Sequence, residues 1–228
     1  YDGNGEAAVE RYTRLFYTLW QTGKQGLSDW LHDALRYQES PYAWQVEREE
    51  RDPVLESAAQ RDIQTLAYLA ELDCETVIRA ISTCVSADFA PVLEGLPRWR
   101  CSAPFDAESL KAFYRAHGSG QFAQYRAFLW EDGKLWPVQE PDSHTPEEMM
   151  GYERQRDQVI ANTRAMLEGN QVNNVLLYGE SGTGKSATVK SLLSIPAFED
   201  LRLIEGQKEE VSTLPDLIRM LGGRRRKF

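Results

Sequence analysis

The sequence predicts a mostly α-helical domain with a small β-hairpin, followed by an α/β domain built on a parallel sheet. Three observations support this prediction. Apolar residues recur at intervals of three or four through most of the first 120 residues, which is typical of amphipathic helices. Two runs of alternating apolar residues then flank Asp132-Gly133, a common hairpin turn. After residue 144 short apolar runs alternate with helical segments, as in α/β proteins.

The predicted helices of the first domain, residues 1–143, begin at recognisable capping residues. Asp52, with Pro53 after it, is a predicted N-cap, and so are Asp73 and Asp106. Ser28 is the predicted cap of the second helix, which ends in the polar residues that follow it. We predict helices over residues 6–20, 27–37, 53–72, 74–85 and 107–117, and a hairpin near residues 122–139.

The second domain, residues 144–228, is predicted to follow a βαβα order. Val175–Tyr178 is a continuous apolar run, which is typical of a buried strand in a parallel sheet. A second strand is predicted over residues 201–204. The predicted helices cover residues 152–167, 185–193 and 213–221. This order predicts parallel strands joined by helical connections.

Residues 179–186 read Gly-Glu-Ser-Gly-Thr-Gly-Lys-Ser, which fits the pattern Gly-x-x-x-x-Gly-Lys-Ser/Thr at every fixed position. The motif follows a predicted strand and precedes a predicted helix, as in P-loop nucleotide-binding proteins. Its glycines let the backbone N–H groups point inward at a phosphate, whose place a side chain would fill. We therefore predict that the chain binds ATP or ADP with Mg²⁺. The alternative is a chance glycine-rich turn with a surface lysine.

Each residue type in this loop has a predicted role. Lys185 would reach the β and γ phosphates, and the Ser186 hydroxyl would be a ligand of Mg²⁺. Glu180 is expected to point to solvent, because a carboxylate turned inward would oppose the phosphates. The predicted nucleotide-binding residues of the loop are Gly179, Gly182, Thr183, Gly184, Lys185, Ser186 and Ala187.

Three further stretches carry a resemblance to a known family: Gly151–Gln155, Asn173–Gly179 and Leu201–Glu205. Together with the P-loop, they resemble a bacterial family of predicted AAA+-type ATPases labelled domain of unknown function 815. The resemblance implies an AAA+-like P-loop fold that binds ATP. It also places Met150, Gly151 and Tyr152 against the adenine base, because an apolar-Gly-aromatic turn packs there in AAA+ modules. The alternative is that these residues only start a helix that packs on the core.

The resemblance further implies ATP hydrolysis that drives the remodelling of a protein partner. Hydrolysis in this class requires an acidic motif on the next strand, and in the resembled family that strand would follow Phe228. The sequence therefore looks like the truncated, first half of such a domain, and it identifies no catalytic residue. Two alternatives are a nucleic-acid-handling ATPase, such as a helicase loader, and a nucleotide-gated binding module without turnover.

Charge and composition limit the partners and the compartment. The net charge is −9, and residues 144–228 carry 12 acidic and 12 basic side chains, so the entire acidic excess lies in residues 1–143. This distribution favours a protein partner over a nucleic acid, and a homo-oligomer is a further possibility. The sequence contains no apolar run long enough to span a membrane and no signal-peptide pattern, which predicts a cytoplasmic protein.

The remaining residue patterns predict structural roles. The three cysteines and three histidines lack the spacing of a zinc site or a disulfide framework. The six tryptophans are expected in cores more than in a ligand cage. The basic run 224–227 is expected to be a solvated connection, with a nucleic-acid patch as its alternative.

Overall fold

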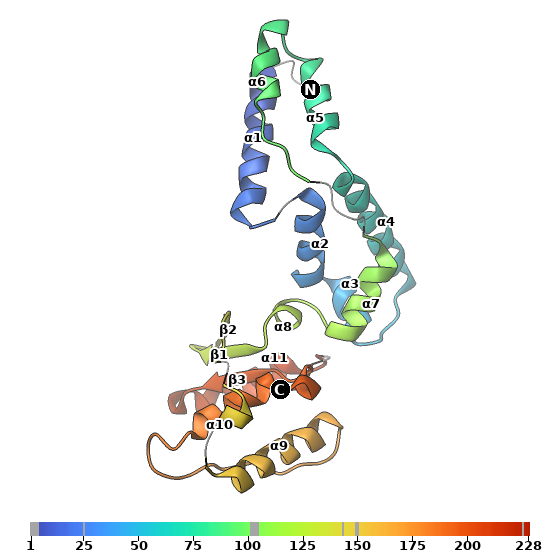
Figure 1. Cartoon of the computed structure of the whole chain (residues 1–228). Helices are drawn as coiled ribbons and strands as arrows, with labels where there is room; N and C mark the ends of the chain where they lie inside the picture. The colour runs from blue at the N-terminus through green and yellow to red at the C-terminus, as the bar shows by residue number, and fades with distance from the viewer. Residues whose placement is uncertain (1–4, 25, 101–104, 143, 149–150, 225) are drawn as a thin grey trace. The chain divides into compact units, whose positions relative to one another are not determined.

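A computed structural model describes residues 5–24, 26–100, 105–142, 144–148, 151–224 and 226–228. The chain divides into two compact units (Figure 1). Unit 1 consists of Tyr1–Val46 and Glu50–Tyr114, and unit 2 consists of Glu47–Glu49 and Arg115–Phe228. The boundary therefore lies well before the predicted one at residue 143. The reason is that the hairpin, which we expected to close the first domain, pairs with a strand of unit 2.

Unit 1 consists of helices joined by loops, without a strand in the residues that the structure describes. Its helices are α1 (Gly5–Gln21), α2 (Leu27–Tyr37), α3 (Pro41–Glu47), α4 (Pro53–Ala70), α5 (Cys74–Ser82), α6 (Ala90–Glu94) and α7 (Ala107–His117), with a 3-10 turn η1 (Ala87–Phe89) before α6. The last residues of α3 and α7 belong to unit 2. The five predicted helices are confirmed as α1, α2, α4, α5 and α7, whereas α3 and α6 were not predicted.

Most of the predicted caps are present. The Asp52 side chain accepts hydrogen bonds from the first turn of α4, and the Asp73 side chain accepts one from the Thr76 N–H at 2.6 Å. The prediction for Ser28 is wrong, because Gly26 occupies the N-cap position of α2 and the Ser28 side chain is buried. Ser40 explains the unpredicted α3: its hydroxyl accepts a hydrogen bond from the Ala43 N–H, so it starts a helix.

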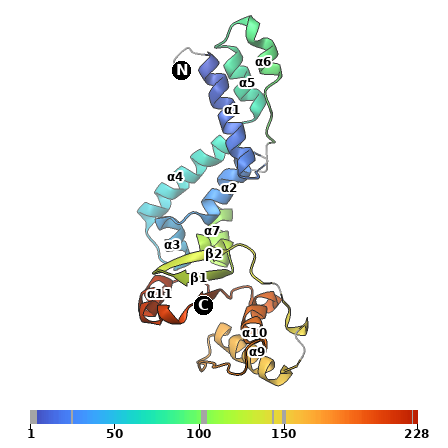
Figure 2. The same cartoon turned by 90° about the vertical axis from the view of Figure 1, so that its left-hand side faces the viewer.

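Two separate cores hold unit 1 together. One joins α2, α3, α4 and α7 around the fully buried Ala43 and Leu110. The other joins α1 and α5 to residues 93–99, and there Tyr12 stacks on Trp99 with the ring centroids 5.1 Å apart. Figures 1 and 2 both show α1 beside α5. The expectation that tryptophans lie in cores is confirmed for Trp99 and for Trp130 of unit 2, but it is wrong for the four that are exposed, Trp20, Trp30, Trp44 and Trp136.

Unit 2 contains a small mixed sheet with helices packed on it. Its elements are α8 (Gln121–Gln124), β1 (Ala127–Glu131), β2 (Lys134–Val138), α9 (Glu153–Leu167), α10 (Lys185–Ser191), β3 (Leu203–Gly206) and α11 (Leu214–Leu221), with 3-10 turns η2 (Pro146–Glu148), η3 (Leu192–Ser194), η4 (Pro196–Phe198) and η5 (Lys208–Thr213). The strand order is β2-β1-β3. The predicted hairpin is confirmed: β1 and β2 are antiparallel, and Asp132 and Gly133 between them both have positive φ.

The predicted strand at Val175–Tyr178 is not formed. These residues are in no regular element, and the side chains of Leu176 and Tyr178 are 83% and 89% exposed. Among the residues that the structure describes, β3 pairs in parallel with β1 of the hairpin and not with this segment. A segment without a neighbouring strand has no hydrogen-bond ladder, so only Leu177 turns inward, onto the core of unit 2.

The core of unit 2 lies between the sheet and the helices that flank the glycine-rich loop. Val159 of α9, Leu192 and Leu193 after α10, and Phe198 form this core together with Ala127 of β1. Figure 2 shows α9 and α10 next to one another. The residues at the starts of both helices line the same cavity of unit 2. No helix in the described part of the chain is long and apolar enough to cross a membrane.

Candidate functional site

The glycine-rich loop of unit 2 has the backbone that its sequence predicts. Gly179, Gly182 and Gly184 have φ values of 149°, 81° and 79°, which a residue with a side chain rarely adopts. A Cβ atom placed on Gly182 or Gly184 would meet nothing within 4 Å. The glycines are therefore required by the backbone conformation, and they leave open space in front of the loop.

The Lys185 side chain folds back over this loop. Its ammonium group donates hydrogen bonds to the carbonyl oxygens of Gly179 and Glu180, at 3.0 and 2.6 Å, and to the Thr183 hydroxyl at 3.3 Å. The Thr183 hydroxyl in turn donates to the Glu180 carbonyl at 2.9 Å. These contacts place one fixed cation at the rim of the loop, directly at the start of α10.

A cavity of about 570 Å³ lies in front of the loop. The segment before α9 and the first turn of that helix also line this cavity, and we call them the second wall. The lining residues are His144, Glu148, Gly151, Tyr152, Gln155, Arg156, Leu177, Tyr178, Gly179, Glu180, Gly182, Thr183, Gly184, Lys185, Ala187 and Thr188. Two stretches about thirty residues apart in the sequence thus share one cavity.

Tyr152 has an unusual backbone in this second wall. It is a non-glycine residue in the left-handed region, with φ 58° and ψ 28°, and it follows Gly151 with φ 81°. The Glu153 carboxylate accepts a hydrogen bond from the Gly151 N–H at 3.2 Å and fixes this turn. The Tyr152 side chain is 61% exposed, so a flat apolar surface is available at the cavity. Strained residues of this kind are concentrated at functional sites.

Most of the residues predicted from the sequence meet at this cavity. Gly179, Gly182, Thr183, Gly184, Lys185, Ala187, Gly151 and Tyr152 line it. Ser186 is exposed and lies next to lining residues without lining the cavity itself. Met150 lies outside the described residues. Glu180 also borders the cavity, and the residue is exposed, as we expected.

Sequence reasoning missed four side chains of the second wall. Gln155 and Arg156 lie one helical turn after Tyr152, so the spacing of three and four residues could have identified them. His144 and Glu148 come from an irregular segment and a 3-10 turn, and no pattern in the sequence marks them. Glu205, the acidic residue nearest the end of β3, is ion-paired with Lys190 at 3.5 Å and does not line the cavity.

Possible metal ligands are few at this cavity. In the part of the chain that the structure describes, no group of three or more His, Cys, Asp or Glu side chains could hold a metal ion. The open Cβ directions at Gly182 and Gly184 fit a phosphate group, which would bring its own oxygen atoms to a cation. The Ser186 hydroxyl, on the first turn of α10, is then the side chain that would join such a cation.

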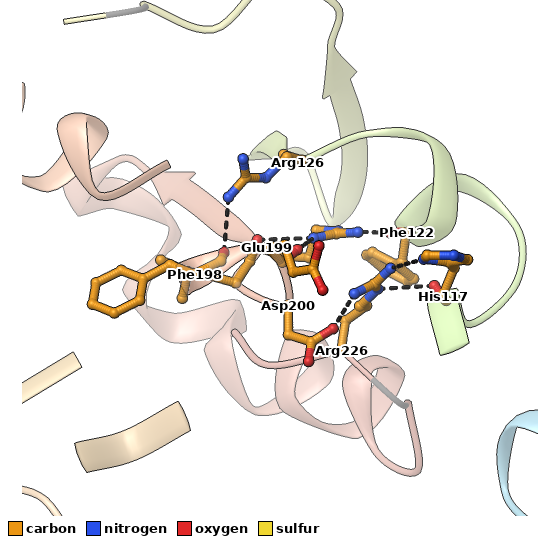
Figure 3. A network of polar contacts seen from close by, with 9 residues as sticks. His117, Phe122, Arg126, Phe198, Glu199, Asp200 and Arg226 are labelled. Carbon is orange, nitrogen blue, oxygen red and sulfur yellow. Dashed lines mark hydrogen bonds and ion pairs between the residues drawn. The ribbon is translucent and has the colours of Figure 1, made fainter. Parts of the chain in front are cut away.

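Part of the basic run after α11 is not solvated, contrary to our expectation: Figure 3 shows Arg226 between Asp200 and His117, whereas Lys227 is exposed. Arg226 is buried, forms an ion pair with Asp200, and donates to the His117 carbonyl at 2.8 Å. Arg224 lies over the Phe122 ring with its guanidinium carbon 5.1 Å from the ring centroid. These two side chains hold the end of unit 2 to the segment before β1. A nucleic-acid patch formed by them is therefore excluded, because neither side chain is free at the surface.

Comparison with known proteins bears on unit 2 alone. Residues 123–228 match the family model "Protein of unknown function (DUF815)". The match covers the hairpin, the loop, the cavity and the buried arginines, and all of it lies within unit 2. No curated protein and no solved structure matches the chain. The resemblance to the domain of unknown function is thus confirmed for this unit.

Proposed function

We propose that unit 2 binds ATP or ADP with Mg²⁺ at the cavity between the glycine-rich loop and Tyr152. The observation that carries the proposal is that a loop of the P-loop sequence has glycines with positive φ and an internal lysine, and opens onto a cavity of about 570 Å³. A cavity of this size is within the range of small-molecule sites. Its two walls would serve the two ends of a nucleotide.

The phosphate end would lie on the loop. Backbone N–H groups of the loop and the Lys185 ammonium would bind the β and γ phosphates, with the phosphate oxygens replacing the carbonyl groups that Lys185 now contacts. The Ser186 hydroxyl would hold Mg²⁺. Ala187 and Thr188, on the first turn of α10, complete this side of the cavity.

The base end would lie on the second wall. The exposed Tyr152 ring offers a surface on which a purine can stack, and Gly151 lets the backbone approach it without a side chain in between. Gln155, one turn further along α9, is the neutral polar side chain that could contact the edge of the base. The proposal that Met150 also lies beside the base rests on the sequence alone.

The wider activity that we propose is that of an AAA+-type ATPase that remodels a protein partner. The support is the resemblance described above, the net charge of −9, and the large side chains that unit 1 exposes, among them Tyr17, Trp20 and Tyr68. An acidic surface with exposed aromatic residues suits a protein partner better than a nucleic acid. The same surface is compatible with self-association.

Substitution of the loop lysine tests nucleotide binding. Lys185→Ala should weaken binding of Mg-ATP more than tenfold, because losing a charge-assisted hydrogen bond costs about 1.5 to 3 kcal/mol and each 1.4 kcal/mol is a factor of ten. Titration calorimetry on the whole chain measures this. Lys208→Ala, which removes an exposed lysine outside the cavity, is the matched control and should bind as the wild type does. Equal affinities for Lys185→Ala and the wild type would refute the proposal.

A further inference from the structure

Unit 1 contains a second cavity, which is lined by the end of α1 and by residues 98–100 and has a volume of about 570 Å³. This volume is within the range of ligand sites. The described residues that line it comprise four large apolar side chains, three cationic side chains and a glycine, and none of them is acidic. The cavity therefore combines apolar surface with positive charge, although residues 1–143 carry the acidic excess of the chain.

Leu19 and Trp99 form the floor of this cavity, and both are buried. The Trp99 ring stacks on Tyr12. The Trp99 indole N–H donates a hydrogen bond to the Leu72 carbonyl at 3.2 Å, and the Trp99 carbonyl accepts one from the Cys74 thiol at 3.4 Å. These contacts fix Trp99 on the core of α1 and α5, so a ligand would not have to order the floor when it binds.

The Trp20 ring forms one side of the cavity and is 71% exposed. It stacks on Phe16, with the ring centroids 6.1 Å apart. The chain turns shortly after it at Gly23, whose φ is 71° and whose N–H donates to the Trp20 carbonyl at 3.0 Å. The Lys24 N–H then donates to the Leu19 carbonyl at 3.3 Å, which completes a Schellman motif and brings Lys24 to the cavity. A large apolar ring exposed beside a cavity is typical of a binding surface.

Two of the three cations at this cavity already have acidic partners. Lys24 forms an ion pair with Asp33, and Arg98 forms one with Glu75. Arg98 also donates to two backbone carbonyl groups. Both cations are thus held at the cavity, but their charge is partly neutralised.

Arg100 is the cation that remains available to a ligand. The residue is exposed, and in the described part of the chain its side chain has no hydrogen bond or ion pair. Its backbone lies against Gly26, the N-cap of α2, where a Cβ atom would collide with the Arg100 carbonyl oxygen. This close approach fixes the backbone from which the guanidinium extends. A guanidinium of this kind favours a carboxylate or another planar anion as its partner.

We propose that this cavity of unit 1 binds a segment of a protein partner in which an aromatic or leucine side chain lies beside a carboxylate. The apolar side chain would pack on the Trp20 ring and the Trp99 floor, and the carboxylate would accept hydrogen bonds from Arg100. The inference rests on the proposed function only in assuming a protein partner. It requires no nucleotide, because the cavity belongs to unit 1 and the glycine-rich loop belongs to unit 2.

A single-stranded nucleic acid is the alternative ligand, since it too joins negative charge to flat apolar groups. Its phosphates continue along the strand, however, and they require a track of cations longer than one cavity. Two of the cations here are paired with carboxylates, and the acidic excess of residues 1–143 would repel further phosphates. One accessible guanidinium beside apolar surface instead suits one carboxylate beside one apolar side chain.

The experiment is fluorescence anisotropy of labelled short peptides with the whole chain, in the absence of nucleotide. Three peptide pools carry Phe or Leu at the centre and differ only in the flanking residues, which are Asp and Glu, Ser and Gln, or Lys and Arg. The acidic pool should bind about three- to tenfold more tightly than the neutral pool, because it adds a partly exposed charge-assisted contact with Arg100. The basic pool should bind most weakly.

Paired variants test each part of the cavity. Arg100→Gln should reduce the affinity for the acidic pool about three- to tenfold and that for the neutral pool by less than about 1.5-fold. Arg61→Gln is its control, at an exposed arginine of α4 outside the cavity. Trp20→Ala should weaken both pools more than about tenfold, because it removes the aromatic side of the cavity. Trp136→Ala, at an exposed tryptophan of unit 2, is the control for this variant.

The outcomes separate this inference from the proposed nucleotide site. Equal binding of the acidic and neutral pools overturns it, as does an affinity for the acidic pool that is unchanged in Arg100→Gln or in Trp20→Ala. A labelled oligothymidylate that binds more tightly than the acidic pool, and is lost in the same two variants, overturns it in favour of a nucleic-acid site. Thermal melting shows whether each variant is folded, and should one fail to fold, the other decides. Lys185→Ala should bind the acidic pool as the wild type does, whatever its affinity for ATP.

Discussion

The buried arginine at the start of β3 offers a test of what stabilises unit 2. Arg202 is 3% exposed, and its guanidinium donates to the carbonyl oxygens of Phe122, Glu199 and Leu201 at 2.6, 2.8 and 2.9 Å. Burial, with the Arg226 and Arg126 cations nearby, lowers the pKa of Arg202 to about 10. The substitution Arg202→Met removes the charge and the three hydrogen bonds while it keeps much of the side-chain volume.

Two opposing effects determine how far Arg202→Met lowers the free energy of unfolding of unit 2. Lowering the pKa from 12.5 to about 10 corresponds to roughly 3 kcal/mol against the buried charge, and this penalty disappears in the variant. Each of the three carbonyls that lose their donor costs about 1 to 3 kcal/mol, more at Phe122 and Leu201, whose hydrogen bonds are buried, than at the exposed Glu199, or roughly 6 kcal/mol in all. We therefore expect a net loss of about 3 kcal/mol in the free energy of unfolding of unit 2.

Native-state amide hydrogen exchange at β1 and β3 measures this loss for unit 2 alone. About 3 kcal/mol corresponds to exchange roughly 100-fold faster in these strands. Arg219→Met is the control, because Arg219 forms an exposed pair with Asp216 and should change exchange by less than about threefold. If Arg202→Met exchanges as slowly as the wild type, or more slowly, the desolvation penalty outweighs the hydrogen bonds and the argument fails.

Two further predictions concern local conformation. Gly182→Ala should lower the melting temperature by several degrees, since a side chain at this positive φ costs about 1 to 2 kcal/mol. It should also weaken ATP binding more than tenfold, because the new Cβ would occupy the place of the phosphate. Gly95→Ala, at a glycine with negative φ, is the control, and an unchanged ATP affinity of Gly182→Ala would contradict the loop geometry. Hydrogen bonds from Thr76 lower the pKa of Asp73, so its stabilisation of α5 is present above about pH 4 and is lost as the pH falls through the lower folded pKa. The protection factors of the α5 amides, which compare the observed exchange with the intrinsic exchange rate at each pH, should therefore fall between pH 5 and 2 in the wild type and fall less in Asp73→Ala; equal pH dependence of the protection factors would exclude this role.

Local sequence determined most of the helices. Asp52 and Asp73 cap their helices through bonds to residues two or three positions away, and such bonds depend only on the neighbouring sequence. The hairpin turn at Asp132-Gly133 is equally local. The error at Ser28 arose because α2 already begins at Leu27, so Ser28 lies within the first turn of the helix, where its side chain is buried.

The glycine-rich loop of the candidate site was predicted from the sequence, whereas the second wall was predicted only in part. The loop residues could be predicted because consecutive glycines and a lysine determine both conformation and charge. The second wall was found only in part, since Gly151 and Tyr152 came from a resemblance and His144 and Glu148 had no pattern. Their place at the cavity depends on how the segment after the hairpin packs, through contacts such as Asp142 with Lys190.

The sequence by itself determined the helices, the hairpin and the phosphate-loop conformation, because each depends on interactions within a few residues. The tertiary structure alone decided which strands pair, where the units divide and which charges are buried. Phe128 of β1 pairs with Ile204 of β3, far along the chain, so the hairpin belongs to unit 2. Val175–Tyr178 has no neighbouring strand with which to form hydrogen bonds. Arg226, in a run that looked solvated, is buried because Asp200 and the His117 carbonyl meet it from distant segments. Long-range contacts of this kind have no local pattern, since their energy depends on the fold that brings them together.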